Sequence, residues 1–120
     1  MSLFNRFRGY DDDGVEVAKL PIWPAITTVA EVLSGEITDA DAASRFGLSD
    51  SEIVEFAQVK LKVENDISSM VSSLVTAGVD IGMSTTIAKA VVRNDVTQTL
   101  MRAELRYCDA NEFNASLGIA

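Results

Sequence analysis

The fold is decided by residues 49–78, which read SDSEIVEFAQVKLKVENDISSMVSSLVTAG. Ser49 is a favoured N-cap residue, and Glu52 follows three positions later, which is the spacing of a capping box. No glycine or proline interrupts the segment before Gly78, which stands where a glycine commonly ends a helix. The segment therefore predicts one helix over residues 50–77, roughly 40 Å long.

The apolar positions of this helix recur at intervals of three and four residues. The stripe consists of Ile53, Phe56, Val63, Ile67, Met70, Leu74 and Ala77, and Lys60 interrupts it. Such a stripe is typical of a coiled coil between subunits. Further apolar residues at Val59, Leu61, Val71 and Val75 widen the face, which favours the central helix of a bundle that is buried on most sides. The two interpretations are compatible, because a long helix can pack on its own domain and on other copies of the chain.

Length and charge narrow the class of protein. The chain has 120 residues, which corresponds to one domain with its own core. It is 48% hydrophobic and 23% charged, and ten Lys or Arg against eighteen Asp or Glu give a formal charge of −8. This charge opposes binding to a phosphate backbone, so the composition argues against nucleic acid as a partner. No apolar run reaches the roughly 20 residues that a bilayer span requires, so we expect no contact with a membrane.

The residue types that carry most enzyme chemistry are missing. The chain has no histidine, which excludes serine triads, cysteine–histidine pairs and histidine zinc sites. Cys108 is the only cysteine, so no disulfide forms within the chain. Carboxylate pairs such as Glu52 and Glu55 lie in polar helical turns, where a solvated face is the expected role. We therefore predict a protein without catalytic residues, bound metal or cofactor.

Residues 1–20 predict an N-terminal arm or tail. Aromatic residues alternate there with Arg6 and Arg8, and they are Phe4, Phe7 and Tyr10. One interpretation is a flexible terminus. The other is an arm that docks these aromatic side chains on a neighbouring subunit. The acidic run that begins at Asp11 does not predict a calcium loop, because Ile22 stands where such a loop needs its closing Glu.

Residues 21–108 predict the helical domain. Pro21 and Pro24 break the chain here, and a helix is expected to begin near Pro24. Trp23, just before it, is expected to be a core anchor. Thr38 is an N-cap for a short helix over Asp39–Phe46, which Gly47 ends. The fold expected is thus an all-α bundle of three to five helices with one long central helix and a flexible arm.

The last part of the chain leaves two arrangements open. We expect a loop or short extended piece over residues 79–83, with Ser84 or Thr85 at the start of the next helix. That helix either continues to about Cys108 or gives way to a second one capped by Asn94. Residues 109–120 predict a C-terminal tail.

The segment from Thr38 to Gln58 has the order of a helix-turn-helix. This order makes a DNA-binding regulator the alternative function. The recognition helix would open with Asp50, Glu52 and Glu55, and these carboxylates would face the phosphates of the duplex. The charge pattern therefore argues against DNA binding even where the shape fits.

Three short motifs resemble small helical proteins from the structural gene modules of tailed bacteriophages. They read Trp23-Pro24-Ala25, Leu33-Ser34-Gly35-Glu36-Ile37-Thr38 and Arg45-Phe46-Gly47-Leu48-Ser49, and the likeness covers about residues 22–78. The resemblance implies a non-enzymatic virion component of the tail, tail tip or fibre attachment. Its expected partners are other virion proteins and copies of itself, in the virion and in the host cytoplasm during assembly.

Two groups of residues are the candidates for subunit contacts. They are Phe4, Phe7 and Tyr10 in the arm, and Ile67, Met70 and Leu74 on the long helix. Replacing Met70 or Leu74 by alanine is expected to cost about 2–5 kcal/mol if the side chain is buried in the core of a monomer. If the side chain faces a partner, the monomer should remain folded and the assembly should fail.

Overall fold

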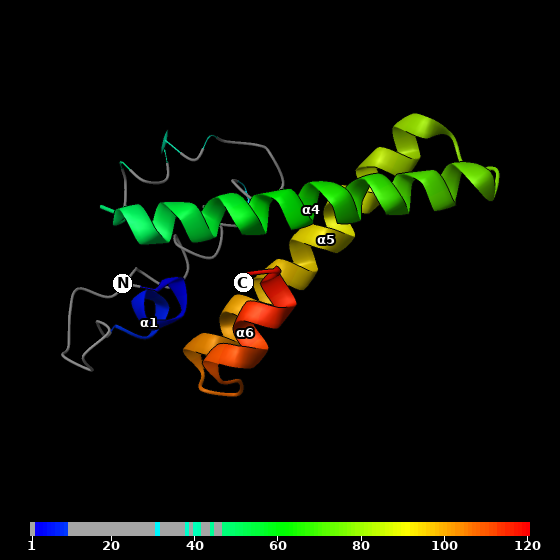
Figure 1. Cartoon of the computed structure of the whole chain (residues 1–120). Coiled ribbons are helices and arrows are strands. Elements are labelled where there is room, and N and C mark those ends of the chain that lie inside the picture. The colour runs from blue at the N-terminus through cyan, green and yellow to red at the C-terminus, as the bar shows by residue number, and fades with distance from the viewer. Residues whose placement is uncertain (1, 10–30, 32–37, 39, 42–43, 45–46) are drawn as a thin grey trace.

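The computed structural model describes residues 2–9, 31, 38, 40–41, 44 and 47–120 (Figure 1). The helices bounded within these residues are α1 (Leu3–Arg8), α4 (Asp50–Thr76), α5 (Ile81–Glu104) and α6 (Ala110–Leu117). Helices α4 and α5 form a long antiparallel hairpin, and α1 and α6 pack at one end of it (Figure 1). The predicted all-α bundle with one long helix is confirmed.

Helix α4 has the ends that its sequence predicts. The Ser49 hydroxyl accepts a hydrogen bond from the backbone N–H of Glu52 at 3.4 Å, and the Glu52 carboxylate accepts one from the Ser49 N–H at 2.8 Å. At the other end Gly78 has φ +95°, in the left-handed region that favours glycine. The N–H of Gly78 donates to the carbonyl of Val75, and the next N–H donates to the carbonyl of Leu74, both at 3.0 Å. These bonds satisfy carbonyls that the end of the helix leaves free.

Helix α5 is a single helix from Ile81 to Glu104, so the first of the two predicted arrangements holds. The prediction of a loop over residues 79–83 is wrong from Ile81 onward, because α5 begins at that residue. The cap is Asp80, whose carboxylate accepts a hydrogen bond from the N–H of Met83 at 3.1 Å, and not Ser84 or Thr85. Ser84 is fully buried one turn into the helix. The connection between α4 and α5 is therefore tighter than the sequence predicted.

Both termini differ from the predicted arm and tail. Residues 3–8 form α1, capped by Ser2, and residues 110–117 form α6, capped by Asp109. Each of these helices buries apolar side chains against the hairpin. Neither segment is a free extension over its described residues, because aromatic and aliphatic side chains at the two ends of the chain pack together.

The hydrophobic core lies at the end of the hairpin that α1 and α6 cover. The buried apolar side chains of this cluster are Leu3, Phe4, Phe56, Val59, Val63, Val92, Val96, Leu100, Ala103, Cys108, Phe113, Leu117 and Ile119. In α4 this cluster stops at Val63, and in α5 it starts at Val92. We refer to this covered half of the molecule as the body.

The predicted short helix before α4 is described only in part. The Thr38 hydroxyl accepts a hydrogen bond from the N–H of Asp41 at 3.2 Å, as expected of an N-cap. Gly47 has φ +60° and follows the predicted helix. Most of Asp39–Phe46, together with Trp23 and the helix expected near Pro24, lies outside the described residues.

Candidate interaction surface

The half of the hairpin farthest from α1 and α6 has almost no buried residues. This segment, residues 67–91, comprises the end of α4, the connecting turn and the start of α5, and we call it the hairpin tip (Figure 1). Within it only Ser84 and Ala88 are buried, each with 0% exposure. Such small side chains let the two helix backbones approach closely. The large apolar side chains of the tip are half-buried or exposed.

Large apolar side chains are exposed on both helices of the hairpin tip. The exposed fraction is 67% for Ile81, 60% for Met83, 43% for Val75, 38% for Val91 and 37% for Ile87. Others are half-buried, namely Ile67, Met70, Val71, Leu74 and Val79. Two helices bury one face of each other, and a third element is needed to cover the remaining apolar surface. Among the described residues, no such element lies on the tip.

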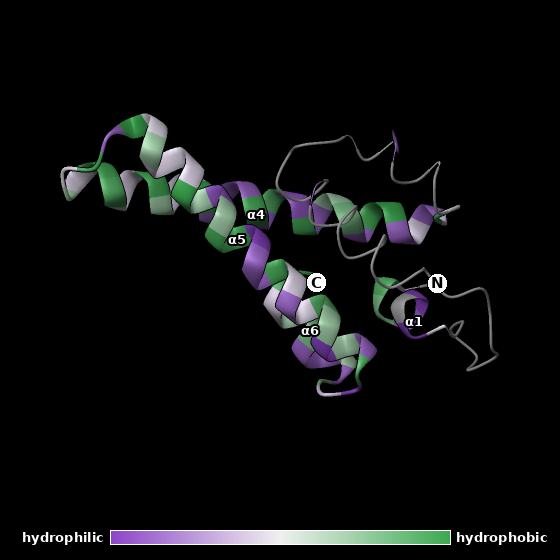
Figure 2. Ribbon diagram, turned by 180° about the vertical axis from the view of Figure 1, so that it is seen from behind, coloured by the Kyte–Doolittle hydropathy of each residue, from purple (hydrophilic) through white to green (hydrophobic). Residues whose placement is uncertain are grey.

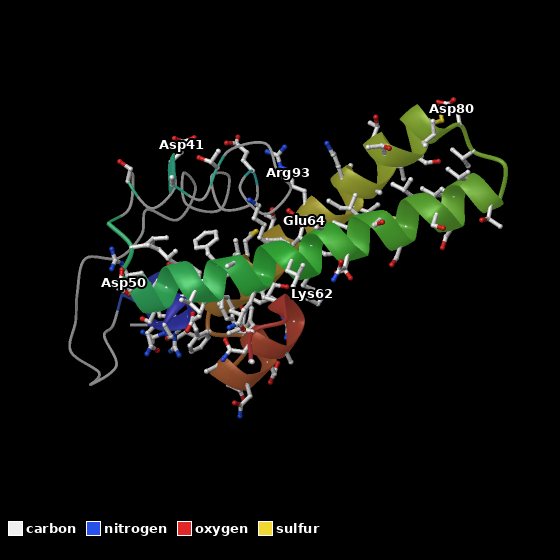
Figure 3. All side chains as sticks on the ribbon, turned by 45° about the horizontal axis from the view of Figure 1, so that its top comes forward. Asp41, Asp50, Lys62, Glu64, Asp80 and Arg93 are labelled. Atoms are coloured by element: carbon white, nitrogen blue, oxygen red, sulfur yellow. The ribbon has the colours of Figure 1, made fainter. Side chains whose placement is uncertain are left out.

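The hairpin tip is also nearly free of charge. Of its residues only Asp80 and Lys89 are charged, although the chain carries ten basic and eighteen acidic residues. Asp80 lies at the far end of the hairpin, where its carboxylate caps α5, while Lys62, Glu64 and Arg93 lie closer to the body (Figure 3). Viewed by hydropathy, the tip is mainly green and white, whereas purple segments are frequent in the body (Figure 2). The apolar side chains exposed on the tip are therefore separated from most charged residues, whereas Val54, Leu61 and Tyr107 are exposed among the charges of the body.

The hydroxyl groups of the hairpin tip are partly satisfied by its own backbone. Thr76 donates to the carbonyl of Ser72 at 2.9 Å, Thr85 donates to Ile81 at 2.9 Å, and Thr86 donates to Gly82 at 3.1 Å. A threonine that donates to the carbonyl four residues earlier needs no outside acceptor for its proton. Next to them, small side chains line a shallow hollow on α4, formed by Ser68, Ser69, Ser72, Ser73 and Thr76. The tip thus combines protruding apolar side chains with an open depression.

A second concave region lies between α4, α5 and α6 in the body. This groove has a volume of about 360 Å³, and its apolar lining includes Val59 and Val96. Cations and carboxylates alternate in the polar lining, which includes Lys62, Asp66 and Arg102, and the Lys62 ammonium lies 2.7 Å from the Asp66 carboxylate. Over the described residues, no three His, Cys, Asp or Glu side chains are grouped so that they could hold a metal ion. The groove presents no arrangement that would activate a nucleophile.

At the first turn of α4, where a helix-turn-helix protein would contact DNA, Glu52 is buried against α1, whereas Asp50, Ser51 and Ile53 are exposed. Glu52 is 0% exposed, and its carboxylate lies 3.4 Å from the guanidinium of Arg6. The same guanidinium donates to the carbonyl of Gly47 at 3.3 Å, and the N–H of Leu3 donates to the carboxylate of Glu55 at 2.7 Å. Three polar contacts therefore attach α1 to the start of α4.

The predicted interaction residues separate into two groups. Phe4 is buried in the body, with its ring centroid 5.4 Å from that of Phe113, so it is not an exposed aromatic residue on a free arm. The side chain of Phe7 and the whole of Tyr10 lie outside the description. Ile67, Met70 and Leu74 lie on the α4 side of the hairpin tip, where each is half-buried, and Ile67 packs against the core cluster of the body.

The exposed apolar residues of α5 were missed by the sequence interpretation. Ile81 and Met83 fall in the segment that the sequence predicts as a loop, so their place on a helix could not be anticipated. The informative signal is the low charge of residues 67–91 together with their apolar content. A solvated pair of helices would be expected to carry charged side chains on its outer faces.

Cys108 should react slowly with thiol reagents while the protein is folded. Burial raises the pKa of its thiol, and the nearby carboxylates of Glu112 and Asp109 act in the same direction, whereas Arg102 and Arg8 oppose it. A raised pKa lowers the thiolate fraction at a given pH, and the thiolate is the reactive form. We expect alkylation by iodoacetamide at pH 8 to be at least about tenfold slower than in urea-unfolded protein. Equal rates would contradict the burial of this side chain.

No family model, curated protein or solved structure matches this chain. Within the described ranges, no helix combines the length and the apolar character needed to cross a membrane.

Proposed function

We propose that the protein is a non-enzymatic structural or assembly protein of a bacteriophage virion, which acts through subunit contacts made by the hairpin tip. The observation that carries this proposal is the group of large apolar side chains on the tip, with Ile81 and Met83 more than half exposed. Contiguous exposed apolar surface of this kind marks interaction sites in proteins. The sequence motifs that resemble tail-module proteins support a place in the tail, tail tip or fibre attachment.

The energetics of the hairpin tip suit a stable contact. Complete burial of a side chain such as Met83 or Ile81 contributes about 1.5–3 kcal/mol. A few such residues at the centre of an interface carry most of the binding free energy. The proposed partners are other virion proteins and copies of the chain itself, in the virion and in the host cytoplasm during assembly.

The contacts of α1 weigh against the alternative, a helix-turn-helix regulator. A recognition helix inserts its N-terminal turns into the major groove and contacts base edges there. In this chain that turn carries Asp50, and Glu52 is buried against Arg6. Asp50 is exposed and would present a carboxylate to the phosphates, and exposing Glu52 as well would require α1 to leave.

Incorporation into particles tests the proposed function. We would introduce Val75→Lys together with Met83→Lys into the gene of the phage that encodes the chain, and quantify the protein in purified particles by mass spectrometry. The wild-type chain should be present, and the double variant should be reduced at least about tenfold, because burying two unpaired ammonium groups is costly. Leu105→Lys with Tyr107→Lys is the matched control, since these residues are 54% and 72% exposed at the body end of α5.

Two results would contradict the proposal. Absence of the wild-type chain from purified particles would exclude a virion component. Equal incorporation of the tip variant and the control would show that the hairpin tip is not the contact surface.

A further inference from the structure

We infer that α1 undocks from the body as a unit while α4, α5 and α6 stay folded, and that its release uncovers the thiol of Cys108. The helix lies at the end of the hairpin opposite the tip, so its release does not depend on the proposed function (Figure 1). Elements of a folded protein commonly open one at a time, at a lower cost than complete unfolding.

Helix α1 depends on docking for its existence as a helix. It has six residues, and isolated helices shorter than about 12 residues are marginal in water. Its contact with the body buries the apolar side chains of Leu3 and Phe4, which are 4% and 5% exposed. Once these side chains leave the body, nothing within so short a segment keeps it helical. Undocking and unfolding of α1 are therefore a single event.

The interface of α1 contains buried polar atoms that lack partners. Among the described residues, none donates a hydrogen bond to Oε2 of Glu52 and none accepts one from Nε of Arg8, although both atoms are buried. A buried polar atom without a partner loses its hydration and gains no bond in return. Release of α1 would admit water to Arg8, which α1 carries, and to Glu52, against which Arg6 packs. These two atoms therefore favour the undocked state.

The rest of the body has packing that does not involve α1. Side chains of α4, α5 and α6 line a common groove without any residue of α1, and its buried apolar residues are Val59, Val63, Val92, Val96 and Leu117. Each of these side chains is at most 5% exposed. The hairpin and α6 keep these contacts when α1 leaves, so its release does not require the remaining helices to separate.

Cys108 lies where release of α1 would be felt. It belongs to the turn between α5 and α6, and α1 packs on both of these helices. Its side chain is part of the same buried cluster as Leu3 and Phe4. Burial raises the pKa of its thiol, and Arg8 of α1 is one of the two cations near enough to oppose that shift. The thiol is therefore covered in the docked state and becomes accessible on undocking.

Thiol labelling of the native full-length protein tests the inference. The reagent is dithiobis(nitrobenzoate), and its reaction with Cys108, the only cysteine, is followed by absorbance. Leu3→Ala should accelerate the labelling at least about tenfold, because truncation of a buried leucine weakens the docking of α1. The matched control is Leu117→Ala, which truncates a leucine on α6 that is 3% exposed, and its labelling rate should stay close to that of the wild type. Far-ultraviolet circular dichroism establishes that the three chains are equally helical.

Urea separates undocking from complete unfolding without any substitution. The dependence of an opening step on urea grows with the surface that the step exposes. Because α1 is a small part of the chain, labelling of the wild-type protein should depend only weakly on urea below the unfolding transition. A labelling rate that follows the global unfolding equilibrium at every urea concentration would overturn the inference.

Two outcomes of the comparison between variants would also overturn it. If Leu117→Ala accelerates labelling as much as Leu3→Ala, Cys108 is reached through opening of α6 or through complete unfolding. If neither variant changes the rate, the reagent reaches the thiol while α1 remains docked.

Discussion

Replacing Phe113 by alanine is expected to lower the free energy of unfolding by about 3–5 kcal/mol, the usual cost of removing a buried aromatic ring. The Phe113 side chain is 0% exposed, and its ring lies 5.4 Å from that of Phe4 with an interplanar angle of 56°. This tilted contact joins α6 to α1, and both helices cover the same end of the hairpin. The cavity left by the substitution would therefore loosen two helices at once.

Urea denaturation followed by circular dichroism measures this effect. Tyr107→Ala is the control, because Tyr107 is an aromatic residue that is 72% exposed, and its loss should change stability by no more than about 0.5 kcal/mol. If Phe113→Ala were as stable as the control, α6 would not be packed on the body in solution.

Replacing Glu52 by alanine is expected to destabilise the protein by about 3 kcal/mol or more, because the substitution breaks a buried ion pair and a helix cap together. The Glu52 side chain is 0% exposed, and that of Arg6 is 11% exposed. The carboxylate oxygen that faces Arg6 also accepts the hydrogen bond from the Ser49 N–H. Removing it would take the Glu52 carboxylate away from the largely buried Arg6 guanidinium, and removing one partner is the costly way to break such a pair.

Glu52→Gln separates the two contributions. Glutamine is accepted at this position of a capping box, so the cap should persist while the negative charge is lost. Its loss of stability should therefore lie between that of Glu52→Ala and that of Glu64→Ala, an exposed site on the same helix that serves as the control. The measurement is again urea denaturation. Equal stability of Glu52→Ala and the control would show that the Arg6–Glu52 pair and the cap contribute nothing measurable to stability.

The boundaries of α4 could be predicted because the chemistry that sets them is local. Ser49 and Glu52 satisfy each other's backbone groups, and Gly78 adopts a conformation that other residues rarely tolerate. The start of α5 was missed because Asp80, Ser84 and Thr85 are all acceptable caps. The choice among them depends on the burial of Ser84 against the opposite helix, which is a tertiary contact and leaves no local signal.

The docking of the two termini was not predictable for a similar reason. Phe4 and Phe113 lie near opposite ends of the sequence, and neither flanking segment shows a long amphipathic pattern. Their packing depends on the hairpin between them, which brings both to one end of the molecule. The α4 side of the candidate surface was predictable, because Ile67, Met70 and Leu74 belong to the predicted apolar stripe of that helix. The α5 side was not, because the side chains that it exposes depend on where the turn ends and α5 begins.

The hairpin also fixes a distance. Residues 67–76 extend α4 beyond the body by about 15 Å, so the proposed contact surface is held away from the charged side chains of the body. Lengthening this part of α4 by one or two residues would rotate the apolar face by a large fraction of a turn, since a helix has about 3.6 residues per turn. Only insertions of nearly whole turns, made in α4 and α5 together, would change the reach while keeping the face aligned. The reach of the hairpin can therefore change only in steps of nearly one helical turn if the apolar face is to stay aligned.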